Sequence, residues 1–444
     1  MKKRLLSLLL CVAMTAVILA GCSAKDAGDD KTNTPTKAET TEKTDNQEAD
    51  KQPATEGGKT IVYWSMWEAT EPQGKVIQEA VNAYMAATGN KVDLQFKGRT
   101  GIREGLQPAL DAGTGIDLFD EDIDRVNGTW GSYLMDLEAL AKDAGYEATA
   151  NAGLIAACRK AGGDVLKSIP YQPNIFAFFY NQSLFDQAGI AEVPKTWAEF
   201  LAVCEKLKAA GIVPLTSDDA YINTNFGYHL ARLIGNEGVE KVVTEGLWAE
   251  EPAVLKVAQA YEELAQKGYL SQYIASNVWP NGQNVELALG EVAMYLNGSW
   301  LPNEVKDMTG PDFKWGCFSY PAVDGGTNGT EASNFGAQVL AINKNSQVAP
   351  EAFEIIKYIT KGEYDKKLSV ESVGIPADSA NAEWPQMLAA VKPVLDSTTV
   401  RYTWAAGAEQ NPDMTPLIKE NFLKLCGGTI TAQQFVDNME AASK

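Results

Sequence analysis

Histidine is almost absent from this chain of 444 residues, since His229 is its only one. A metal site built from several histidines is therefore excluded, and a catalytic triad with an imidazole base would have to use His229 itself. The sequence also has no GxSxG motif, no P-loop and no GxGxxG motif. Nucleotide chemistry and serine-hydrolase chemistry consequently have no motif to support them.

Positive charge is scarce as well. The chain has 38 Lys and Arg residues against 58 Asp and Glu residues, which gives a formal net charge of -20. Nucleic-acid binding requires Lys/Arg patches that displace counterions, so nucleic acid is excluded as a partner. The same imbalance disfavours a polyanionic substrate and electrostatic attachment to anionic lipid.

The longest apolar run lies at the N-terminus. It extends from Leu5 to Ala20 behind a basic start and is shorter than the roughly 20 residues of a membrane-spanning helix. The run ends in small residues, as signal peptides do. Because Leu19–Cys22 resembles a bacterial lipobox, we expect residues 1–21 to be a lipoprotein signal peptide and Cys22 to carry the lipid. The alternative is an ordinary signal peptide with a coincidental cysteine.

A polar segment follows the predicted lipid anchor. Between Ser23 and Lys59, alanine supplies the only apolar side chains, and Lys, Asp, Glu, Thr and Gln predominate. Such a composition cannot bury a hydrophobic core. We therefore expect residues 22–59 to be a disordered tether.

Four cysteines remain in the body of the chain, Cys158, Cys204, Cys317 and Cys426. They are widely spaced and form no CxxC motif, which disfavours zinc or redox sites. Buried free thiols are the favoured interpretation, although a disulfide is compatible with a location outside the cytoplasm.

The folded body opens with a strand, a helix and a second strand. Residues 60–66 are a mostly apolar strand, residues 73–88 place apolar side chains on one helical face, and residues 91–96 alternate. A helix between two strands predicts a parallel pair and an α/β sheet. Further strands are expected at 292–296 and 338–342. Further helices are expected at 196–210, where Thr196 and Glu199 form a capping box, and at 254–267 and 350–361.

Taken in order, six stretches of this body resemble the extracellular solute-binding proteins of carbohydrate ABC importers, the group that contains the maltodextrin-binding proteins. They are VYWSMWE (62–68), GIDLFDEDIDR (115–125), IPYQPNIFAFFYNQSLFDQAGI (169–190), VPKTWAEF (193–200), GEVAMYLNGSW (290–300) and TAQQFVDNMEAA (431–442).

The resemblance implies an α/β fold of the periplasmic-binding-protein type, with two α/β lobes joined by crossing hinge segments around a ligand cleft. We expect lobe 1 to comprise residues 60–170 and 324–370, and lobe 2 to comprise residues 171–323 and 371–444. The expected crossings lie near residues 170–174, 320–323 and 368–376.

The candidate ligand contacts in lobe 1 are aromatic or acidic. A sugar offers an apolar C–H face that an indole can cover and hydroxyl groups that carboxylates can bind. Trp67 and Glu68 follow the first strand, although a core tryptophan beside an exposed acid is the alternative. The acidic loop at 117–125 superficially resembles a calcium loop, but Arg125 and Gly131 occupy the positions that require glycine and glutamate.

Within the family, this acidic loop supplies sugar contacts, which implies ligand roles for Glu121, Asp122 and Asp124. Asp124 and Arg125 match an Asp-Arg pair of the family. An aromatic residue that the family often has near Glu121 is missing here, so the stacking typical of maltodextrin binding is not expected at this loop.

The remaining candidates lie on or near lobe 2. By resemblance, Asn174 is a polar ligand contact on a crossing strand, Trp300 is the stacking aromatic of lobe 2, and Trp404 is an additional aromatic. A solvated hinge residue and a packing role are the alternatives for Asn174 and Trp404. We expect structural roles for Trp197 and His229.

The sequence thus predicts a non-enzymatic binding component that captures an oligosaccharide and delivers it to an ABC permease served by a separate ATPase. No cofactor and no metal are expected. The protein should be a monomer on the extracellular face of the bacterial cytoplasmic membrane, held by the Cys22 lipid. The alternatives are a secreted glycoside hydrolase with paired carboxylates, and an adhesin or scaffold lipoprotein.

Overall fold

Residues 58–444 are described by the structure, a computed structural model of the chain. The predictions for the signal peptide (1–21), for Cys22 and for nearly all of the tether (22–59) lie outside these residues. Within them, no helix has both the length and the apolar character needed to cross a membrane.

Nine strands are found in the described residues. They are β1 (Thr60–Ser65), β2 (Lys91–Phe96), β3 (Leu118–Asp122), β4 (Ile169–Asn181), β5 (Val213–Thr216), β6 (Val292–Gly298), β7 (Trp315–Phe318), β8 (Ala332–Ile342) and β9 (Val400–Tyr402).

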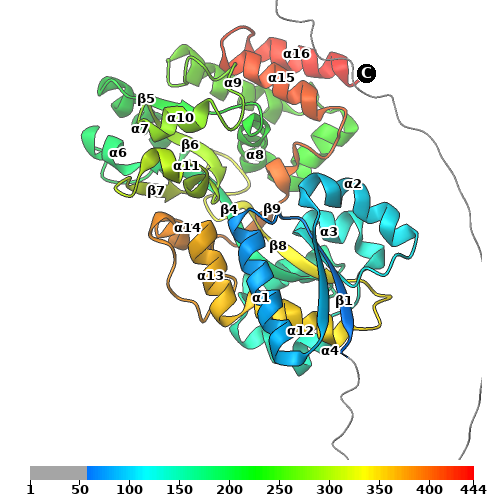
Figure 1. Cartoon of the computed structure of the whole chain (residues 1–444). Coiled ribbons are helices and arrows are strands. Elements are labelled where there is room, and N and C mark those ends of the chain that lie inside the picture. Colours follow the sequence, from blue (N-terminus) through cyan, green and yellow to red (C-terminus); the bar gives the residue numbers. More distant parts are fainter. Residues whose placement is uncertain (1–57) are drawn as a thin grey trace, which may run out of the picture. The chain divides into compact units, whose positions relative to one another are not determined.

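Helices surround the strands (Figure 1). The α-helices are α1 (Pro72–Thr88), α2 (Gly98–Asp111), α3 (Ile123–Thr129), α4 (Glu138–Asp143), α5 (Ala152–Ala161), α6 (Gln182–Gln187), α7 (Trp197–Ala209), α8 (Ile222–Glu245), α9 (Pro252–Gln266), α10 (Gln283–Ala288), α11 (Leu301–Thr309), α12 (Ala349–Thr360), α13 (Gly362–Ser372), α14 (Val391–Ser397), α15 (Thr415–Cys426) and α16 (Ala432–Ala442). The 3-10 helices are η1 (Gly131–Tyr133), η2 (Tyr146–Thr149), η3 (Gln386–Leu388) and η4 (Trp404–Gly407).

Local sequence patterns place the early elements correctly. β1 and β2 pair in parallel with α1 between them, as the hydrophobic pattern predicts. Pro72 at the first turn of α1 and Gly89 in a left-handed conformation after its last residue mark the ends of the helix. The capping box of α7 is present, with Thr196 and Glu199 each satisfying a backbone N–H of the other.

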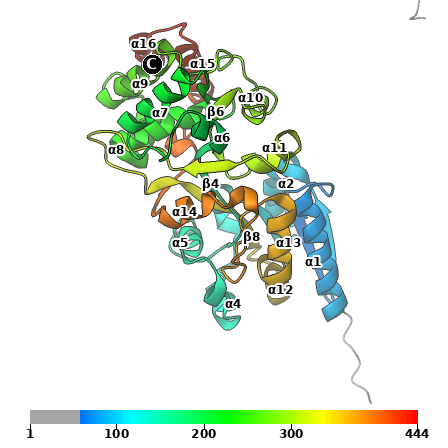
Figure 2. The ribbon, with the colours of Figure 1, turned by 90° about the vertical axis from the view of Figure 1, so that its left-hand side faces the viewer.

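The strands form one hydrogen-bonded path in the order β2-β1-β3-β8-β4-β6-β5, and β7 and β9 pair with β4 and β8. The β1–β2, β1–β3, β5–β6 and β8–β9 pairs are parallel, whereas β3–β8, β4–β8, β4–β6 and β4–β7 are antiparallel. The fold is therefore a mixed α/β fold. Figure 2 shows the two long strands, β4 and β8, at the centre of the ribbon.

Two separate hydrophobic cores lie along this path. One contains β1, β3 and α1 together with Val339–Ile342 and α12. The other contains the second half of β4, β6, α8, α9, α15 and α16. β4 belongs to both, because its residues 169–171 lie in the first core and its residues 175–180 lie in the second. A register shift between Tyr171 and Pro173 separates the two parts of this strand.

The chain also passes between the cores at two later places. Ala332 lies in the second core and Val339 in the first, so this passage lies within β8, later than the expected crossing at 320–323. Leu368 lies in the first core and Val373 in the second, inside the expected range 368–376.

A buried arginine holds several of these segments together. Arg232 of α8 is 0% exposed. Its guanidinium donates hydrogen bonds to the carbonyl oxygens of Tyr320 (2.8 Å), Pro321 (3.2 Å) and Ala332 (2.9 Å) and to the hydroxyl of Tyr402 (2.7 Å). Arg232 thus links α8 to the segment that enters β8 and to β9.

All four cysteines of the body are free thiols. Cys158, Cys204 and Cys426 are buried, and Cys317 is half-buried. Burial raises the pKa of Cys158 to about 12, because an apolar environment disfavours the thiolate. The interpretation as buried free thiols is confirmed for three of them.

Candidate functional site

Four aromatic rings from distant parts of the chain meet in what we call the aromatic cluster, which consists of Phe176, Tyr221, Trp300 and Trp404. The indoles of Trp300 and Trp404 are nearly parallel, at 15° and 6.5 Å between centroids. Both stand nearly perpendicular to the ring of Phe176, at 5.1 and 5.3 Å. Trp404 is 39% exposed, so a flat apolar surface remains open to a ligand.

The position of Trp300 depends on the strand before it. β6 ends at Gly298, and Trp300 lies directly before α11. A Cβ atom at Gly298 would lie 2.4 Å from Cη2 of the Trp300 indole, which is too close for any side chain. The ring therefore lies against the backbone of Gly298, and its Nε1 faces the hydroxyl of Tyr221 at 3.3 Å.

Three carboxylates form what we call the acidic rim, namely Asp219, Glu304 and Glu409. Glu304 and Glu409 adjoin the aromatic cluster, and Asp219 lines a cavity together with Glu409. Glu409 accepts a hydrogen bond from Nε1 of Trp404 (2.8 Å). Glu304 faces Nε1 of Trp279 at 3.4 Å, and Asp219 accepts from the backbone N–H of Trp279 (2.9 Å). Burial raises the pKa of Glu304, because its carboxylate is partly removed from water.

A cavity of about 470 Å³ adjoins the acidic rim. Asp219, Asn223, Glu409 and Lys419 are among the residues that line it. Asn223 is 3% exposed, and its Nδ2 donates to Glu409 (3.0 Å) and to the carbonyl oxygen of Thr415 (3.1 Å). Its Oδ1 has no hydrogen-bond donor among the described residues, and this atom is itself buried.

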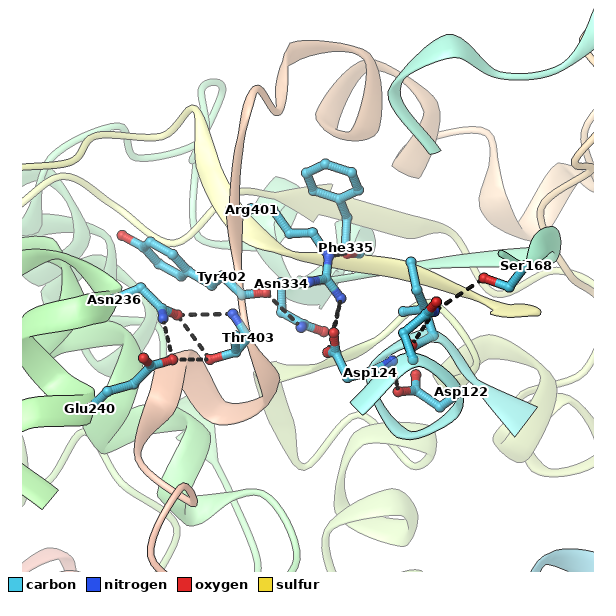
Figure 3. A network of polar contacts seen from close by, with 12 residues as sticks. Asp122, Asp124, Ser168, Asn236, Glu240, Asn334, Phe335, Arg401, Tyr402 and Thr403 are labelled. Carbon is cyan, nitrogen blue, oxygen red and sulfur yellow. Dashed lines mark hydrogen bonds and ion pairs between the residues drawn. The ribbon is translucent and has the colours of Figure 1, made fainter. Parts of the chain in front are cut away.

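A second group of polar side chains lies around Gly336 of β8. A Cβ atom there would lie 3.6 Å from Nη2 of Arg401 and 3.9 Å from Oδ1 of Asn174. Arg401 also donates to both carboxylate oxygens of Asp124, each at 2.9 Å, and to the carbonyl oxygen of Phe335 (2.8 Å). Figure 3 shows this network, in which Asp124 of α3 and Arg401 of β9 point toward each other.

Strand β4 connects the aromatic cluster with the polar side chains around Gly336. Asn174 and Phe176 are two residues apart on this strand, so their side chains lie on the same face of the sheet. Ser299, directly before Trp300, exchanges hydrogen bonds with the backbone of Ile175. The structure therefore brings Trp300 and Trp404 together and places Asn174 two residues from Phe176 of the same cluster. Asn174 and Arg401 both lie beside Gly336, and Arg401 pairs with Asp124.

Glu121 and Asp122 have mainly internal partners. Glu121 is 0% exposed and forms ion pairs with Arg103 (2.7 Å) and Arg125 (3.1 Å). Asp122 caps α3 by accepting from the backbone N–H of Asp124 (2.9 Å). A ligand would have to displace these partners, so the predicted contacts at Glu121 and Asp122 have little geometric support.

Trp67 and Glu68 contact residues other than those of the aromatic cluster. Trp67 is 5% exposed, its Nε1 donates to the hydroxyl of Tyr171 (2.7 Å), and the guanidinium of Arg99 covers its ring at 4.6 Å. Glu68 is exposed, and its Oε1 lies against the backbone of Gly98. The ligand role of Trp67 and Glu68 stays a prediction, and Glu68 is the more accessible of the two.

Sequence reasoning missed the residues that complete this site. Tyr221 and Trp279 are single aromatic residues, and neither lies in a motif that indicates ligand binding. Glu304, Glu409 and Arg401 gave no signal at all, because single charged residues in helices and loops are ordinary. The hydrogen bonds from the two indoles to Glu304 and Glu409 depend on tertiary structure alone.

Asp122 should make stability depend on pH. Burial, assisted by the charges of Asp124 and Glu121 and opposed by Arg401, raises its pKa to about 6. The folded protein then binds a proton that the unfolded chain, with a pKa near 3.9, does not hold between about pH 4 and 6. The free energy of unfolding contributed by Asp122 therefore falls as the pH rises through this window.

Asp122→Asn keeps a side chain that caps a helix and removes the titration. We expect its free energy of unfolding, relative to the parent, to be higher at pH 7.5 than at pH 4.5 by on the order of 1 kcal/mol. Urea unfolding at both pH values measures the difference. Parallel pH profiles of the two proteins would contradict the assignment.

His229 has a structural environment, as expected. It is 2% exposed, and its Nδ1 lies 2.9 Å from the hydroxyl of Tyr320. Burial lowers its pKa to about 3. Trp197 stacks on Phe200 and Tyr320 and meets His229 edge to face. The part of the chain that the structure describes has no group of three or more His, Cys, Asp or Glu residues able to hold a metal ion.

Comparison with known proteins adds family information. Residues 68–366 match the sequence model of the family described as bacterial extracellular solute-binding protein. A binding protein of Brucella abortus is 26% identical over 218 residues, covering 48% of this chain and 51% of the relative. The multiple sugar-binding protein of Streptococcus mutans is 27% identical over 200 residues, covering 44% and 47%. The chain thus spans about half the length of these curated relatives.

Solved structures share the fold over nearly the whole body. A chitin oligosaccharide binding protein superimposes with a TM-score of 0.67 at 21% identity, covering 87% of this chain and 98% of that protein. A secreted solute-binding lipoprotein of Streptomyces coelicolor gives a TM-score of 0.71 at 14% identity, with 86% and 98% covered. At these identities, the likeness establishes the fold.

Proposed function

Because the chain belongs to the bacterial extracellular solute-binding protein family, we propose that it captures an oligosaccharide outside the cell and delivers it to the permease of an ABC importer. The aromatic cluster bordered by the acidic rim is the observation that carries this proposal. Exposed indole rings can cover the C–H face of a sugar, and carboxylates can accept hydrogen bonds from its hydroxyl groups. Charge-assisted bonds of this kind are stronger than neutral ones.

We further propose that the two cores define two lobes that close on the sugar. Lobe 1 would comprise 60–170 and 324–370, and lobe 2 would comprise 171–323 and 371–444. The division of apolar residues between the two cores supports these ranges, and the second passage within β8 suggests a boundary somewhat after residue 324. The ion pair between Asp124 and Arg401 would then join residues of different lobes.

The proposal includes the attachment of the protein to the membrane and the importer subunits with which it works. The Cys22 lipid would anchor a monomer to the extracellular face of the cytoplasmic membrane, with residues 22–59 as the tether. ATP hydrolysis would belong to a separate subunit of the importer. The described residues would bind and release the sugar without changing it.

Saccharide binding should stabilise the fold and compact it. At a hundredfold excess over the dissociation constant, a ligand that binds only the folded state adds about 2.7 kcal/mol to the free energy of unfolding. Titration calorimetry and melting curves with a panel of plant, host and storage oligosaccharides measure binding, and small-angle scattering measures closure. The proposal fails if no saccharide raises the melting temperature.

The same samples separate a binding protein from a glycoside hydrolase. After prolonged incubation, we expect each saccharide to be recovered intact, with no new reducing ends. Their appearance in proportion to protein concentration would favour hydrolysis by paired carboxylates instead.

A further inference from the structure

Carboxylates near the proposed binding site differ in how they are neutralised. On the side of β3 and α3, Glu121 is paired with Arg103 and Arg125, and Asp124 is paired with Arg401. The negative charge of these groups is therefore compensated within the protein. A ligand would gain little by offering them a second cation.

The acidic rim has no such compensation. Within residues 58–444, no Lys or Arg nitrogen lies within 4.0 Å of a carboxylate oxygen of Asp219, Glu304 or Glu409. Lys419 lines the neighbouring cavity, beyond this distance from each of them. Asp218, directly before the rim, is also without a cation, and its carboxylate accepts from the backbone N–H groups of Ala220 (2.7 Å) and Tyr221 (3.1 Å).

Two exposed indoles accompany these charges. Trp279 is 41% exposed and Trp404 is 39% exposed, and each directs its Nε1 toward a carboxylate of the rim. Hydrogen bonding through the ring nitrogen occupies one edge of each indole, and the exposed part of each ring is available to a ligand. The faces of indoles attract cations, and attraction grows when the cation is partly removed from water.

Asn223 lines the same cavity, but its unpaired Oδ1 atom is itself buried, so the carboxylates are the acceptors that a ligand meets there. An ammonium group has three donors and no acceptor, so it can donate to several carboxylates at once. A carboxylate-bearing sugar would be repelled at the same place.

We propose that the saccharide bound at the aromatic cluster carries a free ammonium group, which the acidic rim recognises. This inference rests on the proposed function and narrows its ligand class to amino sugars without N-acetylation. Neutral sugars would occupy the aromatic cluster with lower affinity, because they leave the charge of the rim uncompensated.

The test compares saccharides that differ only at C2. Cellobiose, chitobiose (the β-1,4 dimer of glucosamine) and N,N′-diacetylchitobiose share one linkage and carry hydroxyl, ammonium and acetamido groups. The corresponding monosaccharides glucose, glucosamine and N-acetylglucosamine extend the series. We expect the ammonium-bearing member to bind at least tenfold more tightly than its neutral counterparts at pH 6.5 in calorimetric titration.

Two variants test whether the acidic rim causes the preference for the ammonium group. Glu304→Gln keeps the size of the side chain and the acceptor for Trp279 while it removes the charge. We expect it to reduce the preference for the ammonium group at least threefold. Glu363→Gln, which removes one exposed charge from α13 on the other core, is the matched control and should leave the preference unchanged.

Each outcome decides the question. If a neutral saccharide binds and its ammonium counterpart binds no better, the inference is wrong and the proposed function stands. If no saccharide of this series or of the wider panel binds, both are wrong. An ammonium preference that persists unchanged in Glu304→Gln, or that Glu363→Gln removes equally, would overturn the assignment to the acidic rim.

Discussion

Replacement of Arg232 by methionine is expected to lower the free energy of unfolding by about 3–5 kcal/mol. The variant fills a similar volume but removes the guanidinium donors to the carbonyl oxygens of Tyr320, Pro321 and Ala332. Each buried acceptor left without a partner costs on the order of 1–3 kcal/mol. The tyrosine rings that lie 5.4–6.0 Å from the guanidinium also lose a cation–π partner.

Arg99→Met is a matched control. Arg99 is 40% exposed at its side chain, pairs with Glu71 near the surface and covers the ring of Trp67. Surface ion pairs contribute about 0–1 kcal/mol and exposed cation–π contacts about 0.5–1 kcal/mol, so the control should change stability by no more than about 2 kcal/mol. Urea unfolding followed by tryptophan fluorescence compares both variants with the parent.

Arg232→Lys keeps the charge but replaces the planar, forked guanidinium by a single ammonium group. We expect the free energy of unfolding of this variant to lie between that of the parent and that of Arg232→Met. This variant allows a measurement if Arg232→Met does not accumulate in folded form. A loss below about 1 kcal/mol in Arg232→Met would show that the buried guanidinium is dispensable.

Replacement of Trp300 by alanine is expected to weaken saccharide binding at least tenfold. A stacking contact contributes about 0.5–1.5 kcal/mol beyond the apolar area that it covers, and a factor of ten corresponds to about 1.4 kcal/mol. Trp300 is partly buried and contacts Phe176 and Tyr221 as well as Trp404, so we expect the unliganded protein to lose about 1 kcal/mol of stability. Calorimetric titration with the tightest saccharide of the panel measures the loss.

Trp197→Ala provides the opposite pattern. Trp197 is partly buried and packs on Phe200, His229 and Tyr320 at the edge of one core, away from the aromatic cluster in its contacts. We expect a loss of about 1–3 kcal/mol in stability and little loss of affinity wherever the protein remains folded. Normal binding by Trp300→Ala, together with early melting, would falsify the placement of the site.

Much of the fold could be predicted because its signals are local. The capping box of α7 and the alternation that predicts β2 involve residues within a few positions of each other. β8 was predicted only from residue 338, whereas it begins at Ala332. The stretch Ala332–Ala337 has no apolar alternation, and its extended form depends on pairing with β4 and β9.

The site was predictable only in part, for the same physical reason. Trp300 and Trp404 were predicted from the resemblance to the family, because indoles suit sugars but the ten tryptophans of the chain are not distinguished by this alone. Arg401 pairs with Asp124, which lies 277 positions earlier in the sequence, and no local pattern predicts such a contact. Arg232 lies in an apolar helical stretch, where a lone arginine gives no indication that it is fully buried.

The position of β8 also determines when the chain can fold. β8 lies between β3 and β4 in the sheet, yet it follows β3 by more than two hundred residues. Until residues 332–342 have left the ribosome, the edge of β3 has no partner and the N-terminal core lacks its central strand. Contacts between such distant residues carry a large loop-closure cost and form slowly. A nascent chain built in this order stays incompletely folded during most of its synthesis.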